Sequence, residues 1–191
     1  MTISAHRCIL VRHGETEWSR DSRHTGRTDL PLLPEGEAQA AALRPSLAGF
    51  TFTTVLTSPR RRARETADLA GLGRHAVIDP DLAEWDYGAY EGVTTAQILR
   101  DRPGWDLFDD GVPDGESAHD VAVRVDRVIA RVRDAAGDVA LVAHSHVLRV
   151  LGARWIGLDP CVGRSLVLDP AAFCELSWER EHPVLHSWNR H

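Results

Sequence analysis

Cysteine is scarce in this 191-residue chain, which has only Cys8, Cys161 and Cys174. Their number is odd and no two are spaced as Cys-x-x-Cys, so neither a disulfide framework nor a zinc ribbon is expected. The chain also lacks any run near the ~20 apolar residues of a membrane span, and its first residues show no signal-peptide pattern. These absences predict a cytoplasmic globular protein with reduced thiols.

Positive charge is also in short supply. The chain has 22 Lys and Arg against 28 Asp and Glu, which gives a formal net charge of −6. A nucleic-acid binder would carry a basic stripe, so neither nucleic acid nor membrane is expected as a partner. A homodimer is left open. The length suits one domain over residues 1–191, in which about 70% of the unfolded chain's surface can be buried.

Short apolar runs alternate with helix signals along the chain. We expect strands at 8–11, 53–57, 76–78 and 139–143, and two edge strands within 173–188. We expect helices at 35–47, 60–72, 94–100, 117–135 and 146–156. The clearest helix is 117–135, whose valines at 121, 125, 128 and 132 form one apolar stripe. The alternation predicts an α/β fold with a largely parallel sheet.

Two of the apolar runs end in a histidine. Residues 9–11 lead into Arg12 and His13, and residues 141–143 lead into His144. Because ligands bind beyond the carboxyl ends of parallel strands, both histidines are expected to face one pocket. A third strand ends at Ser58, and Arg62 lies in the first turn of the following helix, where anions are favoured. Arg12 and Arg62 therefore suggest a phosphate clamp.

Less specific interpretations of these residues exist. A histidine at a strand end is often structural, and arginines 60, 61 and 64 are typical of a solvated helix face. Histidines together with Glu84 could bind zinc, but no His-x-x-x-His pair lies on an expected helix and the nearby arginines would repel a cation. From the residues alone, a structural role and an anion-binding pocket both stay open.

Several motifs occur in an order that resembles the histidine phosphatase superfamily, whose fold is phosphoglycerate mutase-like. They are residues 10–16 (LVRHGET), 58–67 (SPRRRARETA), 82–88 (LAEWDYG) with 91–92 (EG), 115–117 (GES) and 142–144 (VAH). The resemblance covers residues 8–156. It implies a three-layer α/β/α sandwich with a mostly parallel central sheet.

Further residues are similar to two subgroups of that superfamily, an actinobacterial broad-specificity acid phosphatase and the sedoheptulose-1,7-bisphosphatase branch. They include Trp18, residues 24–29 (HTGRTD) and the histidine pair His144 and His146. Ser19 stands where many mutases have Asn, and Ser145 stands where the family usually has Gly. A serine adds a Cβ atom and a hydroxyl beside the expected pocket.

The resemblance implies roles for individual residues. His13 would be the nucleophile that forms a phosphohistidine, and Glu84 would be the general acid and then the base. Arg12, Arg62 and His144 would bind the phosphoryl oxygens. His144, if protonated, would add a positive charge. Substrate-binding positions are expected at Ser19, Thr25, Gly26, Ser58, Tyr87, Ser145 and Arg149. Neither a metal nor a cofactor is expected.

The implied activity is hydrolysis of small phosphorylated metabolites, in the manner of an acid phosphatase. Only residues 93–114 separate the acid motif from the long helix, and such a short cap favours an open site and water as the acceptor. The alternatives are a phosphoglycerate mutase and a sedoheptulose 1,7-bisphosphate phosphatase. A non-enzymatic phosphate-binding module is disfavoured because all five catalytic residues are present. Arg27 is expected to lie on the surface.

Overall fold

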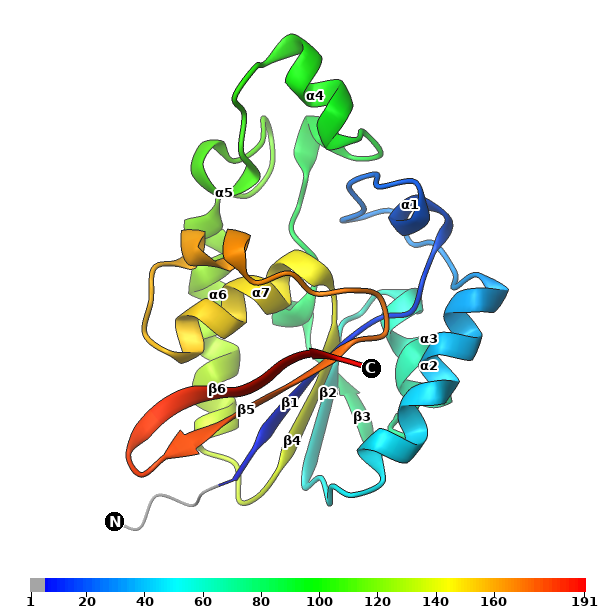
Figure 1. Cartoon of the computed structure of the whole chain (residues 1–191), viewed down its shortest axis with the longest axis vertical. Helices are drawn as coiled ribbons and strands as arrows, with labels where there is room; N and C mark the ends of the chain where they lie inside the picture. The colour runs from blue at the N-terminus through cyan, green and yellow to red at the C-terminus, as the bar shows by residue number, and fades with distance from the viewer. Residues whose placement is uncertain (1–5) are drawn as a thin grey trace.

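The computed structural model describes residues 6–191, and one sheet forms its centre (Figure 1). The strands are β1 (Cys8–Arg12), β2 (Thr54–Thr57), β3 (Ala76–Ile78), β4 (Val139–Ala143), β5 (Phe173–Glu179) and β6 (His182–Arg190). They lie in the order β3-β2-β4-β1-β5-β6. The first four in this order are parallel, while β5 and β6 are antiparallel additions.

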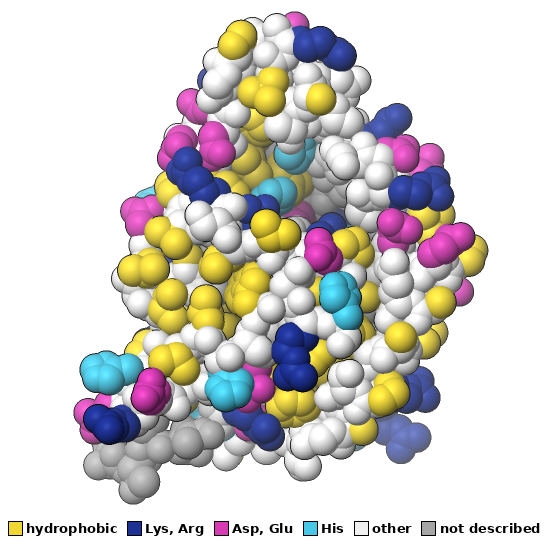
Figure 2. All heavy atoms as spheres, viewed as in Figure 1, with side chains coloured by type: hydrophobic (Ala, Val, Ile, Leu, Met, Phe, Trp, Pro, Cys, Tyr) yellow, Lys and Arg dark blue, Asp and Glu magenta, His cyan; other side chains and the backbone are white. Residues whose placement is uncertain are grey.

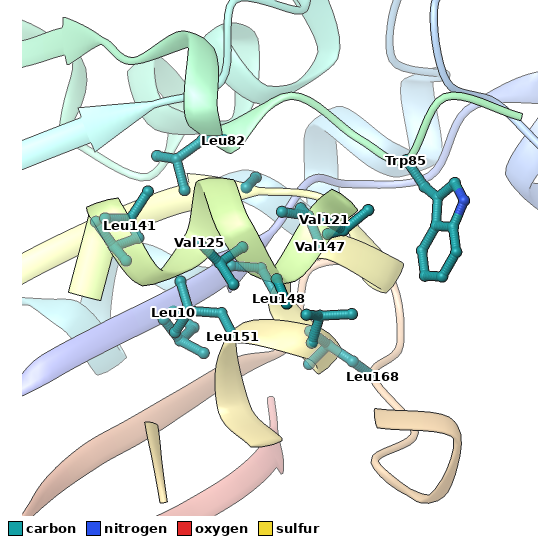
Figure 3. Packing of buried hydrophobic residues seen from close by; sticks show 14 of the residues in the cluster. Leu10, Leu82, Trp85, Val121, Val125, Leu141, Val147, Leu148, Leu151 and Leu168 are labelled. Atoms are coloured by element: carbon teal, nitrogen blue, oxygen red, sulfur yellow. The ribbon is translucent and has the colours of Figure 1, made fainter. Parts of the chain in front are cut away.

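Helices cover both faces of the sheet. Helices α2 (Pro34–Leu47) and α3 (Arg61–Leu69) lie on one face, and α6 (Ala118–Arg133) and α7 (Ser145–Trp155) lie on the other (Figure 1). Side chains alternate along β1, so Ile9 and Val11 pack on the α2/α3 side while Leu10 packs on the α6/α7 side (Figure 3). The predicted three-layer α/β/α sandwich is confirmed.

The predicted elements are present with small shifts at their ends. The long helix is α6, in which all four stripe valines are buried, and Ser117 caps it in a capping box with Asp120. The predicted helix 94–100 is α4 (Thr95–Asp101). The predicted helix 60–72 ends earlier, at Leu69, and a 3-10 turn η1 (Gly73–His75) follows.

One strand prediction is wrong in part. Strand β5 was expected at an edge, but it pairs with β1 on one side and with β6 on the other, so only β6 lies at that edge. Short helices at α1 (Glu17–Arg20) and α5 (Leu107–Asp110), and the 3-10 turns η2 (Pro80–Leu82), η3 (Gly88–Tyr90) and η4 (Pro160–Ser165), were not predicted. None of these segments is long enough to show a helical periodicity.

Residues 88–114, here called the cap, project beyond the carboxyl ends of the parallel strands and carry η3, α4 and α5 (Figure 1). The two ends of the cap meet. Ala89 N–H donates to the carbonyl of Pro113 at 2.9 Å, and Glu116 N–H donates to the carbonyl of Asp86 at 2.9 Å. Gly88 has a φ of +48°, and a Cβ there would lie 2.1 Å from the Pro113 oxygen, so this junction requires glycine.

No helix within residues 6–191 combines the length and the apolar character needed to cross a bilayer.

Candidate active site

His13 lies where β1 ends, and its backbone N–H donates to the carbonyl of Ala143 at the end of β4. Its ring Nδ1 is 2.7 Å from the Gly14 carbonyl oxygen. Because a carbonyl can only accept, Nδ1 carries the proton and Nε2 keeps its lone pair. Burial, with the positive charges of Arg62 and Arg12, holds the pKa of His13 well below 6.5. The ring is therefore a neutral imidazole with Nε2 unprotonated.

Two glycines fix the loop that follows His13. A Cβ on Gly14 would lie 2.2 Å from the carbonyl oxygen of Gly36, and a Cβ on Gly36 would lie 2.1 Å from that of Glu15. The loop and the first turn of α2 are thus in direct backbone contact. Gly14 N–H also donates to the Thr66 hydroxyl of α3 at 3.0 Å. Both helices on this face of the sheet therefore hold the His13 loop in place.

Arg62 lies behind the histidines and is fully buried. Its Nε–H donates to His144 Nδ1 at 3.1 Å, and its two terminal nitrogens donate to the carbonyls of Thr28 and Thr25, each at 2.9 Å. Arg12, by contrast, lines the cleft. The two arginines were expected to form one clamp, but in this structure only Arg12 faces the cleft and Arg62 holds His144.

His144 is fixed at both ring nitrogens. Since Nδ1 accepts from Arg62, the proton is on Nε2, which donates to the Ser58 hydroxyl at 2.6 Å. Burial and then the charge of Arg62 lower its pKa well below 6.5. His144 is therefore neutral here, and the positive charge expected of a protonated His144 is absent. Its ring centroid is 5.1 Å from that of His13.

Glu84 accepts three hydrogen bonds from backbone N–H groups. Oε1 accepts from Trp85 at 2.8 Å and Val147 at 2.9 Å, and Oε2 accepts from His146 at 3.1 Å. Two of these donors belong to the first turn of α7, where free N–H groups and the helix dipole favour a carboxylate. The junction between β4 and α7 thus positions two site residues. His144 belongs to the junction itself, and Glu84 is held by the N–H groups at the start of α7.

These groups surround a cleft of about 520 Å³ beneath the cap, visible as the hollow with histidine side chains in Figure 2. Eight predicted site residues line it: Arg12, His13, Ser19, Thr25, Glu84, Tyr87, Ser145 and Arg149. Four others, Gly26, Ser58, Arg62 and His144, do not reach its surface. They form the layer behind it, and their expected contacts with substrate stay predictions.

Several predicted substrate-binding groups already have partners in the protein. The Ser19 hydroxyl closes the capping box of α1 with Thr16. Gly26 packs against the backbone of Trp85, where a Cβ would lie 2.4 Å from the carbonyl oxygen. Ser145 does not have a positive φ, so serine in place of glycine causes no backbone strain there. Arg27 is exposed, as expected, and pairs with Asp86 at 2.6 Å.

Arg149 lies in the cleft wall. It donates to the carbonyls of Gly163 at 2.9 Å and Arg164 at 2.7 Å, and its guanidinium lies over the ring of Phe108. Burial lowers its pKa.

The prediction omitted twelve residues of the cleft wall, and four of these carry aromatic rings: His24, Trp105, Phe108 and His146. Two of them had a sequence signal, because His24 and His146 belong to the motifs shared with the phosphatase subgroups. Trp105 and Phe108 lie in the cap, where no motif marked them. Within residues 6–191, no group of three or more His, Cys, Asp or Glu side chains is arranged to hold a metal ion.

The sequence of the chain matches a family model over residues 8–191, described as the histidine phosphatase superfamily, branch 1. The chain belongs to the histidine phosphatase superfamily. This histidine phosphatase is 38% identical over 185 residues to sedoheptulose 1,7-bisphosphatase of Saccharomyces cerevisiae, covering 80% of the chain and 68% of the relative. It is 40% identical over 176 residues to an acid phosphatase of Mycobacterium tuberculosis, covering 90% of the chain and 86% of the relative.

Solved structures agree with the sequence comparison. The product of the open reading frame Rv3214 of Mycobacterium tuberculosis superposes with a TM-score of 0.93 at 37% identity, over 97% of each chain. The phosphoglycerate mutase-like fold inferred from the motifs is confirmed, and this histidine phosphatase is a phosphoric monoester hydrolase.

Proposed function

We propose that the enzyme hydrolyses small phosphorylated metabolites through a phosphohistidine on His13. The observation that carries this proposal is the hydrogen bond from Nδ1 to the Gly14 carbonyl, which leaves the Nε2 lone pair at the cleft. Nε2 attacks phosphorus, the N–P bond forms and the ester O–P bond breaks. Water then attacks the phosphohistidine, which releases phosphate and restores the imidazole.

Arg12 lines the cleft beside His13 and provides the positive charge that stabilises the transferring phosphoryl group. Burial lowers the pKa of Arg12 to about 10, so the guanidinium is still charged at neutral pH. Arg62 and His144 approach the same place from behind. In this proposal they bind phosphoryl oxygens once the substrate is in place, and no metal takes part.

Glu84 moves the protons in both steps. It gives a proton to the departing alkoxide in the first step and takes one from the attacking water in the second. Its carboxylate is held in place by three backbone N–H groups. In this scheme Glu84 carries a proton when the first step begins and has lost it when water attacks.

A sugar bisphosphatase is the second candidate, consistent with the similarity to the yeast relative. Arg149 lines the cleft and provides positive charge for a second phosphate. Arg164 also lines the cleft, but its guanidinium is paired with Asp109. A mutase is disfavoured because the cap is short and the cleft is open to solvent (Figure 2). The cytoplasmic location, the homodimer and the single domain stay predictions.

Rapid-quench labelling with a ³²P-labelled substrate tests the proposal. We expect an acid-labile, base-stable phosphoryl group on His13, and no labelling or turnover in His13→Ala. Phosphate on a serine, or full turnover by His13→Ala, would contradict the mechanism. With 3-phosphoglycerate, phosphate release is expected to outrun isomerisation, and the opposite result would select the mutase.

A further inference from the structure

His146 is a cleft residue whose side chain the proposed mechanism leaves unused. Only its backbone N–H takes part, by donating to Glu84. Its ring is enclosed by those of Phe108, Tyr87, His24 and Trp85, with centroids 5.7, 5.9, 6.2 and 6.3 Å away. A ring enclosed in this way keeps one orientation, so any group that it presents to the cleft is fixed in direction.

A hydrogen bond to Tyr87 decides which nitrogen of this ring carries the proton. The Tyr87 hydroxyl lies 2.7 Å from Nδ1 and has no other partner within residues 6–191. Burial raises the pKa of Tyr87 well above 10, so the phenol keeps its proton. If Nδ1 were the donor, the buried phenol proton would have no acceptor. The hydroxyl therefore donates to Nδ1, and the ring proton is on Nε2.

The Nε2–H group of His146 faces the cleft. His146 lines the cleft, and its Nε2 has no hydrogen-bond partner within residues 6–191. This nitrogen is not among the polar atoms that are buried without a partner, so it is accessible from the cleft. Burial, and then the charge of Arg149, lowers the pKa of His146 well below 6.5. The cleft wall thus presents a neutral N–H donor on the same residue whose backbone N–H holds Glu84, the residue that must reach the leaving group.

We propose that His146 is a specificity-determining residue whose Nε2–H donates to an uncharged oxygen, a hydroxyl or a carbonyl, on the alcohol portion of the substrate. The inference rests on the proposed function, because it takes the alcohol to lie on the Glu84 side of the cleft. The substrate class is a hydroxylated alkyl phosphate such as a sugar phosphate. Uncharged polar and aromatic neighbours in the wall, Thr95 and Trp105 among them, suit the same class of ligand.

Two small esters with the same carbon chain test this inference. Glycerol 1-phosphate carries hydroxyls on its alcohol portion and n-propyl phosphate does not. We expect the wild-type enzyme to prefer glycerol 1-phosphate. His146→Phe is expected to lower kcat/KM for this ester about tenfold, as for one lost hydrogen bond, and to leave kcat/KM for propyl phosphate nearly unchanged.

His146→Gln is the matched control, since its amide N–H can replace Nε2–H and is expected to restore part of the preference. Tyr87→Phe, which releases Nδ1 and permits the other tautomer, is expected to weaken the preference without abolishing turnover. Equal losses on both esters in His146→Phe would assign His146 to positioning Glu84 and overturn the inference. So would a wild-type enzyme without the preference. Phosphohistidine trapping from propyl phosphate tests the proposed function separately.

Discussion

Gly36→Ala should reverse the usual effect of this substitution in a helix. Alanine is the better helix former by about 1 kcal/mol, so propensity alone predicts a more stable protein. In α2, however, the new Cβ would lie 2.1 Å from the carbonyl oxygen of Glu15 and 2.7 Å from its nitrogen. Ordinary contacts begin near 3.5 Å, so the backbone must move by roughly 1 Å. The group that moves is the loop that carries His13.

This displacement has two measurable consequences. Overpacking of this kind costs about 1–3 kcal/mol, so the free energy of unfolding should fall rather than rise. A shift of about 1 Å in the nucleophile loop should lower kcat/KM by roughly 100-fold. Urea unfolding measures the first effect, and steady-state hydrolysis of phenyl phosphate measures the second.

Gly49→Ala is the matched control, because it lies just beyond the other end of α2 and a Cβ there meets nothing within 4 Å. Its free energy of unfolding should stay within about 0.5 kcal/mol of wild type, with kcat/KM unchanged. A Gly36→Ala enzyme as stable and as active as Gly49→Ala would refute the direct contact between α2 and the His13 loop.

Three further predictions concern protons and metals. Glu84→Gln should lower kcat/KM for glycerol 1-phosphate by about 10²–10⁴-fold but much less for p-nitrophenyl phosphate, whose leaving group needs no proton; equal losses would remove Glu84 from the acid role. His13, His24, His144 and His146 have lowered pKa values in the folded protein. The unfolded chain therefore binds more protons below pH 6.5, and the free energy of unfolding should decrease as the pH is lowered below 6.5. His24, with a pKa of about 4, accounts for a decrease of about 3 kcal/mol in the free energy of unfolding between pH 6.5 and pH 4. Urea unfolding at pH 7 and pH 5 measures this decrease, and equal free energies at the two pH values would contradict the prediction. Excess EDTA should leave kcat/KM unchanged, whereas a loss restored by added metal would overturn the metal-free mechanism.

The part of the site that the sequence predicts best is the pair of histidines at strand ends. Strands buried on both faces read as continuous apolar runs, so β1 and β4 and the residues that follow them were located from the residues alone. Parallel pairing then brings His13 and His144 to the same edge of the sheet. The family motifs added the role of Glu84, whose position no periodicity indicates.

The burial of Arg62 could not be predicted from the sequence. Its guanidinium is held by the carbonyls of Thr25 and Thr28, so its place depends on the conformation of that loop. The loop in turn is held by Glu91, whose carboxylate accepts from the N–H groups of Gly26 and Thr28. Contacts between residues more than 60 positions apart leave no local pattern in the sequence.

The meeting of the two ends of the cap gives this enzyme an exchangeable module. Hydrogen bonds close residues 88–114 at their base, and the first part of the cap, residues 91–94, is also bonded to the loop at 23–28. The free energy of closing such an insertion rises only slowly with its length. The sheet and its helices carry the reacting groups, while the cap supplies Trp105 and Phe108 to the cleft wall. Evolution can therefore replace the outer part of the cap, residues 95–111, and with it the choice of alcohol, while keeping Glu91 and the loop that holds Arg62.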